Sequence, residues 1–197
     1  MKTIVNCLFG LLSLCLTSCG GYSGKPVAIQ PPDFYKNHTT RSQIAVGGEA
    51  YFSEKKAKLA FDEDVTSDFM PVLLTVRNDT GELLTVQRSD MVLTSADGKI
   101  SHPAPWEVMY HVFKGDTAGD TFALGIIAGQ ATEETNDKMS EDWQRKQFPE
   151  HSTIAKGRGT GGFVYFRRNP GKAPFTVKVM VNKMKAQETV KIELPLE

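Results

Sequence analysis

The chain has 197 residues, 40% of them hydrophobic, with 23 basic and 23 acidic side chains and a formal net charge of zero. This length is sufficient for one domain with a sizeable core. The balanced charge gives no electrostatic basis for binding nucleic acid, so we expect no nucleic-acid partner.

The chain begins with a short leader that ends at a cysteine. Lys2 supplies a positive charge, residues 4–16 form a mostly apolar run, and two small residues precede Cys19. This series is typical of a signal peptide, and the apolar run is too short to span a bilayer, which takes about 20 residues. The sequence therefore predicts that residues 1–18 are a signal peptide.

The end of the leader, Leu16-Thr17-Ser18-Cys19, resembles the lipobox of bacterial lipoproteins. The resemblance implies that Cys19 is linked to diacylglycerol and anchors the mature protein to a membrane of the cell envelope. Gly20, in place of Asp, is similar to lipoproteins that are transported to the outer membrane. Cys7 and Cys15 would leave with the leader, so we expect no disulfide in the mature chain. The alternative is an ordinary signal peptide followed by a chance cysteine.

Residues 19–42 are rich in Gly, Ser, Pro, Thr and Asn and contain few large apolar residues. This composition is typical of a linker, and Pro26, Pro31 and Pro32 favour an extended chain. At ~3 Å per residue, such a linker would hold a domain several tens of ångströms from a bilayer. We therefore expect a flexible linker up to residue 42 and a folded domain over residues 43–197.

The folded part alternates apolar and polar residues in short runs that are separated by turn residues. Residues 69–78 give the strongest strand pattern, and residues 106–113 are also predicted as a strand. Further strands are predicted at 44–52, 83–87, 91–94, 162–166, 175–181 and 189–194. About seven or eight short strands predict a mainly β chain, an antiparallel β-sandwich that is Ig-like in the loose sense.

One helical insertion, at about residues 117–148, interrupts the strand pattern. Its first part, residues 122–129, is apolar and small. Its second part, residues 132–147, has acidic residues four positions before basic ones, an arrangement that stabilises helices. Apolar residues, including Met139 and Trp143, recur at four-residue spacing on one face, which predicts that this face packs against one sheet.

Two other interpretations of the insertion stay open. Its small residues allow close backbone approach, which would suit a docking face for a partner or for the membrane; the third interpretation is a mobile loop. In a docking face, exposed apolar and aromatic side chains would supply the binding energy. The candidate partner-binding residues are Phe122, Leu124, Ile126, Ile127, Met139 and Trp143.

The order of these features resembles a loose group of uncharacterised bacterial envelope lipoproteins. The resemblance depends on the lipobox leader, on the run Met70–Asn78, on the Gly- and Ala-rich insertion and on the run Gly161–Phe166. It spans most of the mature chain, but its motifs are structural. It therefore implies no reaction and no catalytic residue.

Patterns that carry chemistry in other proteins have structural interpretations here. The letters G-x-G-x-x-G at residues 157–162 precede a predicted strand rather than a helix, which favours a turn over a dinucleotide site. The acidic cluster at residues 62–64 lacks the spacing of a calcium loop, and no two histidines lie four residues apart. We therefore expect no cofactor, no metal and no catalytic residue.

Together these patterns predict a lipid-anchored bacterial envelope protein with a non-enzymatic binding or assembly role. Its expected contacts are the membrane, through the lipid on Cys19, and an unknown envelope protein. Two alternatives stay open: an envelope hydrolase with a site assembled from scattered residues, and a purely structural tethered domain. A deep pocket with convergent titratable groups would favour the hydrolase, and the absence of an exposed apolar patch would favour the structural role.

Overall fold

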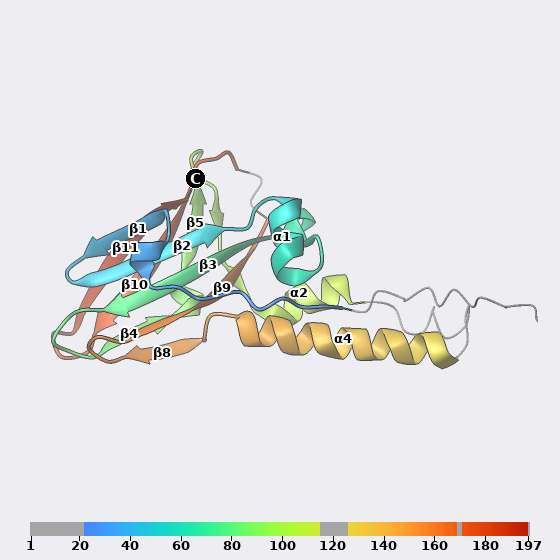
Figure 1. Ribbon diagram of the computed structural model, residues 1–197. Coiled ribbons are helices and arrows are strands. Elements are labelled where there is room, and N and C mark those ends of the chain that lie inside the picture. Colours follow the sequence, from blue (N-terminus) through green and yellow to red (C-terminus); the bar gives the residue numbers. More distant parts are fainter. Residues whose placement is uncertain (1–21, 115–125, 169–170, 197) are drawn as a thin grey trace, which may run out of the picture.

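The computed structural model describes residues 22–114, 126–168 and 171–196, without the side chains of 126–131. Two antiparallel β-sheets pack face to face, and the α-helices of the described residues lie together at one end of the molecule (Figure 1). The prediction of a mainly β chain, a β-sandwich with a helical insertion, is confirmed. The closer likeness to an immunoglobulin topology stays a prediction.

The first sheet has five strands, in the order β1-β2-β3-β9-β7. They are β1 (Asn37–Arg41), β2 (Ile44–Ala50), β3 (Phe69–Asn78), β9 (Gly159–Arg167) and β7 (Pro103–Ala104). The central strand β3 has the bounds that its sequence pattern predicts. It pairs with β2 on one side and along its length with β9 on the other.

The second sheet follows the order β6-β5-β10-β4-β8, with β11 paired to β10. Its strands are β6 (Ile100–Ser101), β5 (Val92–Ser95), β10 (Phe175–Lys183), β4 (Leu84–Gln87), β8 (His151–Ile154) and β11 (Glu188–Leu196). Strand β11 pairs with β10 along its whole length, so β4 and β5 share the opposite edge of β10. The predicted strands in this sheet agree with the observed ones to within a few residues.

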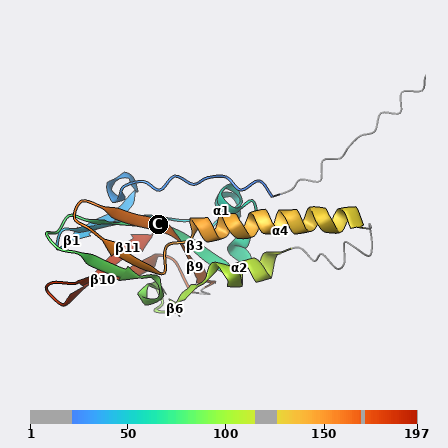
Figure 2. The same cartoon turned by 90° about the horizontal axis from the view of Figure 1, so that it is seen from below.

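Helices α1 (Glu54–Phe61), α2 (Trp106–Phe113) and α4 (Ile126–Lys146) cover the outer face of the first sheet. Short 3-10 turns are η1 (Pro32–Phe34), η2 (Val65–Ser67) and η3 (Arg88–Asp90). Helix α4 begins before the predicted start at residue 132. It projects past α1 and α2, away from the sandwich, in both views (Figures 1 and 2).

Strands β3 and β9 are buried on both faces, which gives the molecule two hydrophobic cores. Side chains alternate along a strand, so Val72 and Val164 point into the inner core between the sheets. Their neighbours Leu73 and Phe163 point into an outer core beneath the helices. The molecule therefore has three layers: sheet, sheet and helices.

The prediction of a strand at residues 106–113 is wrong, because this segment forms helix α2. Its aromatic and β-branched residues suit a strand, but Met109 and Phe113 are four residues apart and share one face of a helix. Met109 is fully buried, and the ring of Phe113 lies 6.2 Å from that of Trp143. Packing against the outer core therefore outweighs local strand propensity.

The structure also corrects the prediction of a flexible linker up to residue 42. The described part of this segment runs along the first sheet towards the helices (Figure 1). Within it, β1 pairs with β2, Tyr35 is buried, and Tyr22 and Val27 pack against the outer core. A few well-spaced apolar side chains thus hold a segment whose composition is typical of a linker.

The glycine-rich run enters strand β9, as predicted, and one of its glycines permits a close backbone contact. The amide of Phe148 donates to the carbonyl of Phe163 at 2.8 Å, and this contact joins the end of α4 to β9. A Cβ atom on Gly162 would lie 2.6 Å from the nitrogen of Phe148 and 2.7 Å from its Cα. Gly162 therefore serves packing in this fold.

Substitution Gly162→Ala is expected to lower the free energy of unfolding by about 1–3 kcal/mol, the usual cost of overpacking a tight site. The added methyl group would push against backbone, which cannot rotate away as a side chain can. Urea denaturation measures the change. The control is Gly81→Ala, because a Cβ there meets nothing within 4 Å; equal losses for both variants would contradict the packing role of Gly162.

Candidate functional site

Helix α2 is apolar, yet most of its surface is not buried. Of its eight residues only Met109 is fully buried, whereas Val112 is 51% exposed. The rings of Trp106 and Tyr110 lie 5.8 Å apart and are both partly exposed. Exposed aromatic and aliphatic groups of this kind are typical of contact surfaces. Helix α2 is therefore the main candidate for a binding face.

A half-open cavity of about 650 Å³ lies beside the first turn of α2. One part of its lining is apolar, and Ile100 in that part is 62% exposed. The other part is basic. The apolar residues are Ile100, Pro103, Ala104, Pro105 and Val108, and the basic ones are Lys99, His102, Arg167 and Arg168.

The cavity forms where the chain crosses from one sheet to the other. Strand β6 pairs with β5 in the second sheet, and β7 pairs with β9 in the first. The hydroxyl of Ser101 donates to the carbonyl of Arg167 at 2.6 Å, which ties the crossing segment to the end of β9. The guanidinium of Arg168 donates to the carbonyl of Thr66, so this side chain is held in place.

A cavity with basic and apolar sides suits a ligand in which an anionic group lies next to an apolar group. Guanidinium groups bind carboxylates and phosphates through charge-assisted, often bidentate hydrogen bonds. Arg167 and Arg168 are both exposed at the cavity rim. The neighbouring apolar lining continues onto α2 through Val108. The cavity and α2 therefore form one continuous contact surface, which we call the α2 surface.

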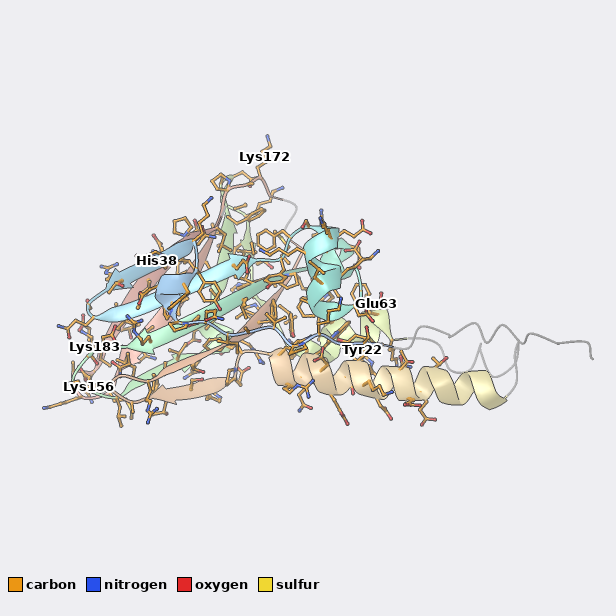
Figure 3. The ribbon with its side chains drawn as sticks, in the orientation of Figure 1. Tyr22, His38, Glu63, Lys156, Lys172 and Lys183 are labelled. Atoms are coloured by element: carbon orange, nitrogen blue, oxygen red, sulfur yellow. The ribbon has the colours of Figure 1, made fainter. Side chains whose placement is uncertain are left out.

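A second polar cluster joins the start of the described chain to α4. The hydroxyl of Tyr22 donates to Oδ2 of Asp142 at 2.5 Å and accepts from Nε1 of Trp143 at 2.9 Å. Asp142 also pairs with Lys146 and, at 2.9 Å, with Arg145. Figure 3 shows Tyr22 beside α4.

Burial controls the protonation of this cluster. Burial raises the pKa of the Tyr22 hydroxyl far above its ordinary value, and the carboxylate of Asp142 acts in the same direction. Burial lowers the pKa of Lys146, while the hydrogen bond to Asp142 opposes that shift. Burial likewise raises the pKa of Tyr165, whose hydroxyl donates to the carbonyl of Trp143. At neutral pH the two tyrosine hydroxyls of the cluster are therefore neutral.

The acidic cluster at residues 62–64 has structural roles. Asp62 ends α1 with a φ of 59° and accepts a hydrogen bond from the backbone N–H of Ser23 at 2.9 Å. The side chain of Asp64 accepts from the backbone N–H of Thr66 at 3.1 Å and so caps η2. Within the described residues, no group of three or more His, Cys, Asp or Glu is arranged to hold a metal ion.

The six predicted partner-binding residues have different outcomes. Met139 and Trp143 meet in the outer core, where they are 3% and 0% exposed, so they do not form an exposed contact surface. Their burial agrees with the packing interpretation of the helix. Cys19, Phe122 and Leu124 lie outside the described residues, as do the side chains of Ile126 and Ile127.

Sequence reasoning missed the α2 surface because it treated the aromatic residues of this segment as part of a strand core. The spacing of the apolar residues in this segment nevertheless indicates a helix. Trp106, Met109, Tyr110 and Phe113 recur at three- and four-residue intervals after Pro105, as in an amphipathic helix. Val112 adds an exposed apolar position beyond the buried face of such a helix. That excess indicates a helix with an exposed apolar side.

Comparison of the chain with protein-family models, with curated proteins and with solved structures gave no match. Among the helices that the structure describes, none is both long and apolar enough to cross a membrane. A proposal of function must therefore be argued from the residues of the α2 surface and of the polar cluster at Tyr22.

Proposed function

We propose that this chain is a lipid-anchored protein of the bacterial cell envelope, at the outer membrane, with a non-enzymatic binding role. The lipobox-like leader and Cys19 support the location. The α2 surface supports the binding role, and its exposed apolar helix beside a basic cavity is the observation that carries the proposal. An anchor confines the domain near membrane-bound partners and so raises their effective concentration.

The partner that fits this surface is an envelope protein that presents an acidic segment next to apolar residues. Carboxylates of such a segment would pair with Arg167 and Arg168, and apolar side chains would enter the cavity against Ile100 and Val108. Trp106 would supply an aromatic anchor at the edge of the contact, as is common at binding hot spots.

The two alternatives fit these observations less well. A purely structural tethered domain predicts no exposed apolar patch, whereas Val112 on α2 is 51% exposed and Ile100 at the neighbouring cavity is 62% exposed. An envelope hydrolase needs convergent groups that can exchange protons or attack a bond. The charged groups at this half-open cavity are basic and suit anion binding: they are Lys99, Arg167 and Arg168.

The binding role predicts a crosslink that depends on cavity charge. A photo-reactive amino acid at Val108, in the full-length protein in cells, is expected to give one dominant protein adduct. Arg167→Glu should lower its yield about tenfold, because a hydrogen bond to a charged group contributes about 1.5–3 kcal/mol. Mass spectrometry of the adduct should place the crosslink in an acidic segment of the partner.

Two controls distinguish this result from non-specific crosslinking. The same photo-reactive residue at Met184, which is 55% exposed at the opposite end of the molecule, should give no such adduct. Lys156→Glu, a charge reversal at an exposed residue far from the cavity, should leave the yield unchanged. Equal yields at Val108 and Met184, or no effect of Arg167→Glu, would contradict the proposed role of the α2 surface.

A further inference from the structure

The first described residue of the chain is attached firmly to α4. The hydroxyl of Tyr22 is hydrogen-bonded to Asp142 and Trp143 of α4. The next residue, Ser23, donates from both its backbone N–H and its hydroxyl to Asp62 at the end of α1. A Cβ on Gly24 would lie 2.6 Å from Oδ2 of Asp142, so the segment crosses α4 in close contact. We call residues 22–24 with these partners the anchor clamp.

The anchor clamp leaves little chain between the domain and a lipid on Cys19. Only two residues, Gly20 and Gly21, separate Cys19 from Tyr22. Three fully extended residues span at most about 11 Å. While Tyr22 is bound to α4, the bilayer surface must therefore pass within about that distance of its backbone.

The same geometry determines which end of the molecule faces the bilayer. Tyr22 lies beside α4 among the helices, whereas Lys156 and Lys183 lie at the opposite end of the sandwich (Figure 3). Helix α4 continues from Asp142 to Ile126 on the side away from the sandwich (Figure 1). At 1.5 Å per residue it extends about 24 Å beyond Asp142, which is further than the anchor can reach.

We propose that the anchor clamp holds the helical end of the domain against the bilayer, with the first half of α4 at the lipid headgroups and the far turns of the sandwich pointing away. This inference rests on the proposed function, because it requires a lipid on Cys19. The exposed polar side chains of α4 ahead of Asp142, such as Glu134 and Lys138, suit the headgroup layer rather than the hydrocarbon.

Release of the clamp would free the domain from this position. Without the contacts of Tyr22, the next side chain of the N-terminal segment that packs against the outer core is Val27. About eight residues at ~3 Å each would then separate the anchor from the domain, a reach of about 24 Å. The clamp therefore sets the distance between the α2 surface and the membrane.

The test places a short-range fluorescent probe on the full-length lipidated protein in vesicles of phosphatidylethanolamine and phosphatidylglycerol. An environment-sensitive maleimide dye is attached to Glu134→Cys on α4 or to Lys156→Cys at the far end. Headgroup spin-labelled lipid is expected to quench the dye at residue 134 strongly and the dye at residue 156 hardly at all. Tyr22→Ala should reduce quenching at residue 134 to the level at residue 156.

Matched variants keep the result interpretable. Gly24→Val should also reduce quenching at residue 134, because its side chain collides with Asp142 while Tyr22 is intact. Lys25→Ala, an exposed neighbour in the same segment, should leave quenching unchanged. Circular dichroism checks that each variant is folded. Equal quenching at residues 134 and 156, or no effect of Tyr22→Ala and Gly24→Val in folded protein, would overturn the proposal.

The anchor itself is tested separately on the same samples. The intact mass of the purified protein should show acyl chains on Cys19, and the chain without an added cysteine should not react with the maleimide. An acylated protein with equal quenching at the two positions would refute the orientation, while the lipid anchor on Cys19 would still be supported. A reactive, unacylated Cys19 would refute both the proposed function and this inference.

Discussion

Replacing Trp143 with alanine is expected to lower the free energy of unfolding by about 3–5 kcal/mol, the usual loss for a large aromatic side chain removed from a core. Trp143 is fully buried and meets the rings of Phe61 and Phe113 edge-on, at centroid distances of 6.1 and 6.2 Å. Its indole N–H also holds Tyr22. Urea denaturation followed by circular dichroism measures the loss.

The control for this substitution is its neighbour on the same helix. Gln144 is exposed, so Gln144→Ala should change the free energy of unfolding by no more than about 0.5 kcal/mol. A loss below about 1 kcal/mol for Trp143→Ala would show that the helical layer does not unfold together with the sheets. The Trp143→Ala variant should also weaken the anchor clamp, because Tyr22 loses one of its two hydroxyl contacts.

The sequence pattern predicts the strands better than the layers above them. Residues 69–78 have the period of a strand, and β3 has those bounds. The same residues also carry a second signal, because Leu73 between Val72 and Leu74 makes both faces of the strand apolar. Strands that are apolar on both faces are covered on both. This feature indicates a third layer, although it does not tell which segments supply it.

Helix α4 of that layer is predicted, whereas helices α1 and α2 are missed for identifiable physical reasons. The strand propensity of Trp, Val, Tyr and Phe hides the helical spacing of α2. Helix α1 is not predicted from the sequence: its buried residues Ala57, Ala60 and Phe61 have helical spacing, but two of the three are small alanines. Tertiary contact with the outer core decides the structure of both helices.

The candidate site depends on contacts between distant parts of the chain, which no local pattern contains. The cavity joins residues 99–105 to Arg167 and Arg168 through the hydrogen bond from Ser101, across 66 positions. The anchor clamp joins Tyr22 to Asp142 across 120 positions. By contrast, the packing of Met139 and Trp143 on one helix face follows from four-residue spacing, and the sequence predicts it.

Substitution Asp142→Ala is expected to lower the free energy of unfolding by about 3–5 kcal/mol, the usual result of removing one partner of a buried ion pair. Lys146 is 7% exposed at its side chain and would lose its partner carboxylate, keeping the hydrogen bond to the carbonyl of Ala60. Burial already lowers its pKa, so the unpaired ammonium would be more costly still. Thermal and urea denaturation at neutral pH measure the loss.

Helix α4 contains its own control for this substitution. Glu134 and Lys138 form an ion pair with the same four-residue spacing, but their side chains are 69% and 57% exposed. Glu134→Ala should therefore cost only about 0.3–0.5 kcal/mol, as is usual for exposed pairs on a helix. Similar losses for Asp142→Ala and Glu134→Ala would contradict the buried character of the first pair.

A double substitution separates the cost of an unpaired charge from the value of the pair. In Asp142→Leu with Lys146→Met, both buried charges are replaced by apolar groups of similar size, which is often neutral or stabilising. We expect this double variant to regain most of the stability that Asp142→Ala loses. It should nevertheless fail to hold Tyr22, whose hydroxyl needs the carboxylate of Asp142. Stability and clamping would then be separable, and Asp142 would serve mainly to position the anchor.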